Sequence, residues 1–92
     1  MSLPFEWDPD KSASNRKKHG VTFEEAATAF GDARALTIHD EDHSVREDRF
    51  ITLGISARGR LLVVVHSDHG ESVRIISSRL ATTREEAAYV KR

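Results

Sequence analysis

The sequence of 92 residues contains no cysteine, which excludes a disulfide framework and a thiolate metal site. It also has no apolar run near the roughly 18 residues that a membrane-spanning helix needs. The first ten residues, MSLPFEWDPD, have neither the basic region nor the apolar core of a signal peptide. These absences favour a cytoplasmic protein, and the length predicts one domain over residues 1–92. We give no weight to residues 1–3, a candidate cloning remnant.

The charges nearly cancel, to a net charge of −1, but they are unevenly distributed along the chain. Residues 1–48 contain 6 Lys and Arg against 11 Asp and Glu, whereas residues 49–92 contain 8 against 4. All but one of the basic residues in the second half are arginine, whose planar guanidinium suits phosphate and carboxylate groups. The second half can therefore meet a phosphate backbone or an acidic partner, or it can be an ordinary solvated surface.

The chain is organised around a predicted hairpin between Gly59 and Arg79. Residues 61–65 form a continuous run of Leu and Val, which is typical of a strand covered on both faces. Residues 68–70, Asp-His-Gly, predict a turn, and residues 72–78 predict the second strand. Because so short a loop cannot connect parallel strands, we expect the two strands to be antiparallel.

Caps and periodicity predict the other elements. Asp8 before Pro9 starts a helix, and Gly20 ends it. A final helix starts at one of two capping boxes, Thr82–Glu85 or Thr83–Glu86. The remaining predictions are an edge strand at residues 5–7, a second helix from residue 21, and strands at residues 35–38 and 49–56. The order predicts an α+β fold with N-terminal helices, an antiparallel four-stranded β-meander core and a C-terminal helix.

Four segments resemble the BrnT toxins of bacterial toxin–antitoxin operons: FEWDPDKSASNRKKHGVTFEEA, REDRF, GRLLVVVH and VRIISSRLATTREEAAY. The resemblance extends from Phe5 to Tyr89, and its specific parts include the Trp-Asp-Pro start, the Lys-His-Gly helix junction and the Ile-Ile-Ser-x-Arg strand end. It implies a fold similar to that of the RelE-type ribonuclease toxins. It also implies a small metal-independent endoribonuclease, with no cofactor, that cuts RNA and inhibits translation.

The resemblance further implies a cognate antitoxin, BrnA, that binds and neutralises the toxin. Because that antitoxin carries the DNA-binding element, we expect a heterotetramer of two toxins and two antitoxins that reaches operator DNA only through the antitoxin. No membrane partner is implied. One position departs from the family, in which a basic residue often precedes the glycine of the hairpin turn, where this chain has His69. We therefore leave this turn out of the expected RNA contacts.

Arginines are the strongest candidates for a ribonuclease site. Metal-independent cleavage needs groups that deprotonate the 2′-hydroxyl, stabilise the phosphate charge and protonate the leaving 5′-oxygen. Arg79 follows two small serines that leave room for a ligand, so we expect it to bind phosphate, with a structural salt bridge as the alternative. Arg74 lies between apolar residues, where its partner can be protein, water or RNA. Arg49 opens a strand beside two acidic residues, so a local ion pair is the alternative to catalysis.

Histidines and the single tyrosine add weaker candidates. His19 precedes a helix-ending glycine and offers an imidazole for proton transfer, although capping of the helix end is the alternative. Lys18 can help to bind phosphate, and Tyr89 can stack on a base, donate a proton or pack in the core. His66 is interpreted as a near-core residue. The acidic loop at residues 39–48 contains two more histidines, where a solvated loop is favoured over a metal site.

The sequence thus predicts a metal-free ribonuclease site with catalytic Arg79, Arg74, Arg49 and His19. Lys18 and Tyr89 are expected to support RNA binding. The step from an arginine-lined α+β domain to a ribonuclease depends on the resemblance. The alternative is a non-catalytic protein-binding module that acts as a partner subunit.

Overall fold

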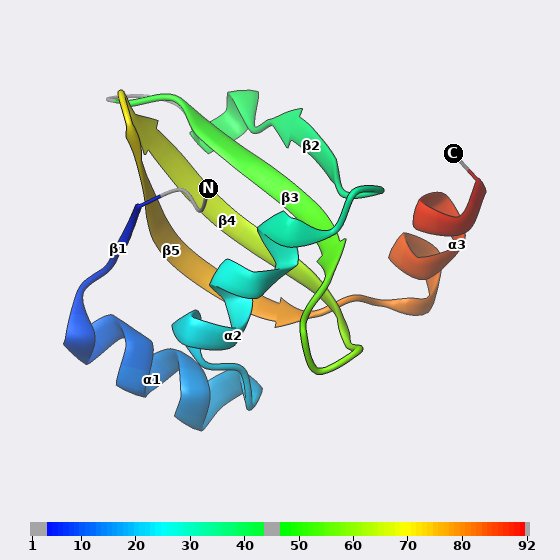
Figure 1. Ribbon diagram of the computed structural model, residues 1–92, viewed down its shortest axis with the longest axis horizontal. Helices are drawn as coiled ribbons and strands as arrows, with labels where there is room; N and C mark the ends of the chain where they lie inside the picture. Colours follow the sequence, from blue (N-terminus) through cyan, green and yellow to red (C-terminus); the bar gives the residue numbers. More distant parts are fainter. Residues whose placement is uncertain (1–3, 44–46, 92) are drawn as a thin grey trace.

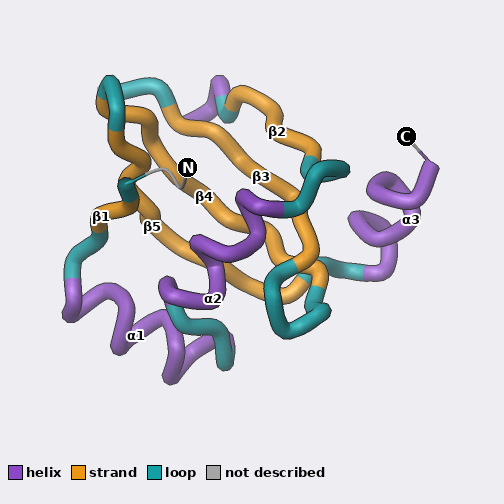
Figure 2. Tube along the Cα trace, in the orientation of Figure 1, coloured by secondary structure: helices purple, strands orange, loops and turns teal. Residues whose placement is uncertain are grey.

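The computed structural model describes residues 4–43 and 47–91, so the candidate cloning remnant lies outside the described residues. This part of the chain contains three α-helices, two 3-10 helices and five strands (Figure 1 and Figure 2). They are β1 (Phe5–Glu6), α1 (Pro9–His19), α2 (Phe23–Thr28), η1 (Ala29–Gly31), β2 (Leu36–His39), η2 (Glu41–His43), β3 (Arg49–Ile55), β4 (Leu61–His69), β5 (Ser72–Leu80) and α3 (Thr83–Lys91). None of these helices is long and apolar enough to span a membrane.

The five strands form one mixed sheet in the order β1-β5-β4-β3-β2. β2 to β5 form the predicted antiparallel meander. The prediction of a four-stranded antiparallel sheet is wrong in one respect, because β1 adds a fifth strand that is parallel to β5. A strand of two residues carries too little pattern to predict its neighbour. Its position is decided by packing, since the ring of Phe5 lies 5.1 Å from that of Phe30 between centroids.

The helices cover the two faces of the sheet unequally. α1 and α2 lie on one face, here called the helical face, and α2 crosses the sheet from the front in Figure 1. Its core contains Val21, Phe23, Ala26, Ala29, Leu62, Val64 and Ile75. The opposite face, here called the open face, carries a smaller cluster in which α3 contributes Tyr89 against Leu53 and Val63.

The helix ends agree with the capping predictions. The Asp8 carboxylate accepts from the Asp10 amide at 2.9 Å, and Gly20 follows α1 with a left-handed φ of 71°. For α3 the structure selects the first of the two boxes. The Glu85 amide donates to Thr82 Oγ1 at 3.2 Å, and the Thr82 amide donates to Glu85 Oε1 at 2.8 Å.

Buried polar side chains attach the N-terminal helices to the sheet. Asn15 of α1 donates to the Ser78 carbonyl at 2.8 Å and accepts from the Ser78 amide at 3.1 Å. The Glu25 carboxylate of α2 accepts from Arg60 and from Ser56 Oγ, next to the turn between β3 and β4. The hydrogen bonds from Arg60 lower the pKa of Glu25, so this buried carboxylate stays charged and paired.

A β-bulge in the β4–β5 hairpin decides which arginines share a face. Arg74 and Arg79 are five residues apart, and this odd separation would put them on opposite faces of a regular strand. The register shifts between Val65 and His66, so that Arg74 is opposite Ser67 and Arg79 is opposite Val63. Those two residues of β4 lie on one face, because four residues separate them. The bulge therefore brings both arginines to the open face.

Candidate active site on the open sheet face

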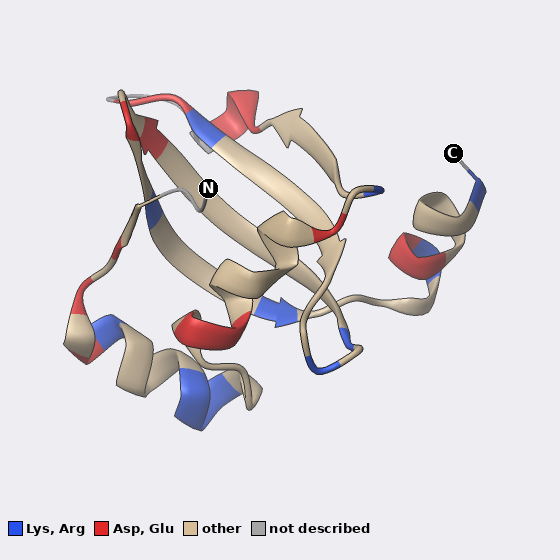
Figure 3. Ribbon diagram, viewed as in Figure 1, with Lys and Arg blue, Asp and Glu red and all other residues tan. Residues whose placement is uncertain are grey.

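Strand register brings Arg49 and Arg74 into one row across the open face. Both are opposite Ser67 of β4, Arg49 from β3 and Arg74 from β5. Because neighbouring strands lie about 5 Å apart, the two Cα atoms are separated by about 10 Å. Figure 3 shows basic residues on both of these strands. Two guanidinium groups on either side of a small side chain can hold one phosphate group between them.

Arg74 has a weak protein partner in the neighbouring strand. Its Nη1 lies 3.8 Å from Glu6 Oε1 of β1, and both side chains are nearly half exposed. Exposed ion pairs of this kind contribute at most about 1 kcal/mol to stability. A phosphate group can therefore replace Glu6 at little energetic cost.

Arg79 has a strong protein partner, which is the salt bridge weighed as the alternative to phosphate binding. Its guanidinium donates to both carboxylate oxygens of Glu85 at 2.8 and 2.9 Å, and also to the Leu80 carbonyl at 3.2 Å. This pair raises the pKa of Arg79 and, with the capping amides, lowers the pKa of Glu85 to about 2. The salt-bridge alternative for Arg79 is therefore present, because the capping glutamate of α3 faces the end of β5. Its guanidinium remains partly exposed, and phosphate binding stays a prediction.

Lys18 and His19 lie at the end of α1, beside the outer edge of β5. They line a hollow of about 200 Å³ together with Ile76 and Ser77. Ser77 is opposite Val65 and so lies between Arg74 and Arg79 along the open face. The two α1 candidates thus share a hollow with the part of β5 that lies between its two arginines.

Tyr89 packs in the core rather than on the surface. Its side chain is 7% exposed, and its hydroxyl donates to Asp32 Oδ2 at 2.5 Å. The same carboxylate oxygen accepts from the Ile55 amide at 2.9 Å. Of the roles considered for Tyr89, the structure shows packing in the core. Tyr89 is therefore not part of the RNA-binding surface proposed below.

The sequence missed one group of polar side chains on the open face. Ser67 Oγ and Glu47 Oε2 lie 2.9 Å and 3.2 Å from His69 Nε2. The sequence prediction missed this group because it assigned residues 68–70 to a turn. β4 extends to His69 and the turn is at residues 70–71, so His69 belongs to the strand that separates Arg49 from Arg74. The alternation of Val65, Ser67 and His69 along a longer strand was the available signal.

His66 lies on the helical face in a buried network, which agrees with its near-core interpretation. Its Nε2 is 2.7 Å from Thr52 Oγ1, its Nδ1 is 3.1 Å from Asp68 Oδ1, and its ring packs against Phe30. Burial lowers the pKa of His66, although Asp68 opposes this effect. A neutral imidazole enclosed in this way has no access to RNA.

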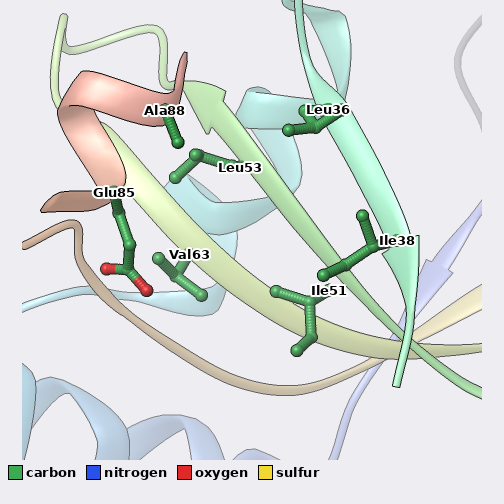
Figure 4. A pocket seen from close by; sticks show the side chains of 7 residues that line it. All are labelled: Leu36, Ile38, Ile51, Leu53, Val63, Glu85 and Ala88. Carbon is green, nitrogen blue, oxygen red and sulfur yellow. The ribbon is translucent and has the colours of Figure 1, made fainter. Parts of the chain in front are cut away.

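An apolar groove lies between α3 and the far end of the open face (Figure 4). It has a volume of about 180 Å³ and is lined by Leu36, Ile38, Ile51, Leu53, Val63, Glu85 and Ala88. Ala88 points toward Leu53 in Figure 4, while Ile38 at the edge of the sheet is 55% exposed. The open face thus combines a polar, basic part with an apolar part. In the described residues, no three His, Asp or Glu side chains are grouped to hold a metal.

Comparison with known proteins identifies the class to which this fold and site belong. A family model described as ribonuclease toxin, BrnT, of type II toxin–antitoxin system matches residues 7–85. The protein is thus a toxin of the ribonuclease class from such systems. More particularly, the chain belongs to the BrnT family, as its sequence segments predicted.

A solved structure supports the fold. The crystal structure of the Brucella abortus ribonuclease toxin, BrnT, matches with a TM-score of 0.70 and 21% sequence identity, over 89% of this chain and 100% of that chain. At this identity the likeness establishes the fold alone. A comparison with curated proteins found no match.

Proposed function

We propose that the protein is a metal-independent endoribonuclease that cleaves RNA on the open face and thereby inhibits translation. The observation that supports this most is the row of Arg49 and Arg74 on either side of Ser67, in a member of a ribonuclease toxin family. In the proposal these two guanidinium groups bind the scissile phosphate and stabilise its developing charge. Their charge persists at any working pH, so binding needs no metal.

The residues around this row have supporting roles in the proposal. Lys18 binds a neighbouring phosphate at the hollow beside β5, and His19 supplies an imidazole there. Arg79 reaches phosphate only after giving up one of its two bonds to Glu85. A fold similar to that of the RelE-type ribonuclease toxins is part of the same proposal.

The proposed partner is a BrnA-like antitoxin that covers the open face. The apolar groove offers burial to a hydrophobic side of the antitoxin, and the arginine row offers a partner to its acidic residues. The wider proposal is a cytoplasmic heterotetramer of two toxins and two antitoxins that contacts operator DNA through the antitoxin.

A non-catalytic partner subunit is the second candidate function. Two observations favour it: Arg74 and Arg79 already face carboxylates within the chain, and the apolar groove suits a protein better than RNA. A direct cleavage assay separates the two candidates, because only the ribonuclease changes RNA length.

The test is cleavage of a defined RNA by the purified protein in EDTA. We expect cleavage in EDTA, and we expect Arg74→Ala to reduce the rate at least tenfold because a phosphate contact is lost. Arg58→Ala is the matched control, since Arg58 is a 71% exposed arginine in the turn between β3 and β4. Activity that disappears in EDTA and returns with magnesium would contradict metal independence. An intact RNA under all conditions would favour the partner-subunit function.

A further inference from the structure

Three side chains from two segments of the chain meet at one end of the arginine row. His69 ends β4, Ser67 lies two residues before it on the same face, and Glu47 precedes β3. His69 Nε2 is 2.9 Å from Ser67 Oγ and 3.2 Å from Glu47 Oε2. Ser67 is fully buried, whereas the His69 side chain is 42% exposed. Ser67 and Glu47 thus fix the position of the imidazole, and its exposed part remains accessible to a ligand.

The contacts of His69 favour one tautomer of its neutral ring. The Glu47 carboxylate lies 3.2 Å from Nε2, so it attracts a proton on that nitrogen and would repel a lone pair there. The lone pair of the neutral ring is then on Nδ1. No described residue forms a hydrogen bond with Nδ1. This is the arrangement in which a carboxylate orients a histidine and stabilises the imidazolium that forms when the ring takes a proton.

The position of His69 relative to the arginines fits a proton-transfer role. The row of Arg49, Ser67 and Arg74 is two residues from His69 along the strand, which is about 7 Å. A phosphate in that row would have its sugar within reach of the ring. Glu47 pairs with His69, Arg49 and Arg74 lie on the same face of the two neighbouring strands, and Arg74 also faces Glu6. Asp68 points to the helical face, where it contacts His66.

We propose that His69 is a catalytic residue of this site, the general base that removes the proton from the RNA 2′-hydroxyl, with Glu47 as its positioning residue. This inference rests on the proposed ribonuclease function. Nδ1 takes the 2′-hydroxyl proton, O2′ forms a bond to phosphorus, and the bond from phosphorus to O5′ breaks. The leaving O5′ takes a proton from water, and His69 later returns its proton to solvent. The products are a 2′,3′-cyclic phosphate and a 5′-hydroxyl end.

The chain contains a matched control in His39. Its side chain is 40% exposed and pairs with Asp48 at 3.1 Å, so its exposure and ion pair closely resemble those of His69. It lies on the helical face, opposite Phe50, and so on the other side of the sheet from the arginines. A general effect of losing a surface imidazole will therefore appear when either histidine is replaced, whereas a catalytic effect will appear only when His69 is replaced.

The experiment compares His69→Gln with His39→Gln in cleavage of an RNA oligonucleotide between pH 5 and 9. We expect His69→Gln to lower the rate by about 10²–10⁴-fold and to abolish the fall in rate at acidic pH. Binding of an uncleavable 2′-deoxy analogue should stay within about threefold of the wild type, since general bases contribute to the reaction rather than to ground-state binding. His39→Gln should keep both the rate and the pH profile.

Two more variants separate catalysis from folding and positioning. His69→Ala should regain part of its activity when imidazole is added, which a folding defect would not allow. Glu47→Gln should lower kcat and leave KM nearly unchanged, because the imidazolium that forms during the reaction loses its carboxylate partner. Wild-type activity and an unchanged pH profile in His69→Gln would overturn the inference. If the wild type itself leaves RNA intact, the proposed function fails first, so the two failures are distinguishable.

Discussion

Glu85 joins three parts of the molecule through one carboxylate. It caps the first turn of α3, binds both ends of the Arg79 guanidinium on β5 and lines the apolar groove. These bonds favour the charged carboxylate, so the pKa of Glu85 falls from 4.5 to about 2. Arg79 of β5, for which the sequence predicted phosphate binding, thus also holds α3 against the sheet.

We expect Glu85→Gln to destabilise the protein by about 1–2 kcal/mol at pH 7, because it loses an ion pair and weakens a cap. Since the folded pKa lies below the unfolded one, this difference is complete above pH 4.5 and disappears as the pH falls toward about 2. Urea unfolding at pH 7 and pH 2.5 measures it. Glu86→Gln is the control, since Glu86 is exposed and belongs to the box that α3 does not use. Equal stability of the two variants at pH 7 would contradict the structural role of Glu85.

At the scale of elements, β3 and η1 approach so closely that one position must be glycine. A Cβ atom on Gly54 would lie 2.7 Å from the Ala29 carbonyl oxygen and 3.3 Å from Ala35 Cβ. The carbonyl belongs to backbone, so no side-chain rotation relieves the clash. This contact brings η1 against the helical face next to the pair of Thr37 and Thr52.

Gly54→Ala should destabilise the fold by about 1–3 kcal/mol, since it overpacks a close backbone contact. The corresponding fall in melting temperature is at least about 4 °C for a domain of this size. Gly31→Ala, in η1 itself, is the matched control because a Cβ there meets no atom within 4 Å. It should change the free energy of unfolding by less than about 1 kcal/mol. A thermal melt of both variants checks the prediction, and a Gly54→Ala variant as stable as Gly31→Ala would refute it.

At the scale of the whole molecule, the helices cover the two faces of the sheet unequally. The helical face is closed by α1 and α2, and the open face keeps Arg49, Arg74 and His69 accessible beside an apolar groove. One surface can then serve both RNA and the antitoxin. If so, an inhibitor competes with substrate directly, and no conformational change in the toxin is needed.

Reversal of charge at Arg74 should therefore weaken both RNA cleavage and antitoxin binding. We expect Arg74→Glu to raise the dissociation constant of the antitoxin complex at least tenfold, because a like charge would face its acidic residues. Arg16→Glu changes the net charge equally at an exposed position of α1 and should leave the affinity unchanged. Titration calorimetry measures both. A toxin with Arg74→Glu that binds the antitoxin at wild-type affinity would show that inhibition uses another surface.

The local sequence determined most elements of this protein. Asp8, Gly20 and Thr82 predicted helix ends that the structure confirms, because capping depends on residues within a few positions of each other. Short loops and apolar runs predicted the antiparallel meander for the same reason. The specific segments also predicted the family correctly.

Only the tertiary structure decided how these elements meet. The parallel pairing of β1 with β5 depends on packing between Phe5 and Phe30, which are 25 positions apart in the sequence. The β-bulge in the β4–β5 hairpin decides on which face of the sheet Arg79 lies. The position of α3 against the sheet decides that Glu85 is its partner. His69 joined the site because β4 runs two residues into the predicted turn at residues 68–70, so that Glu47 and Ser67 reach the same nitrogen. Strand register and long-range packing set these contacts, and neither leaves a local pattern in the chain.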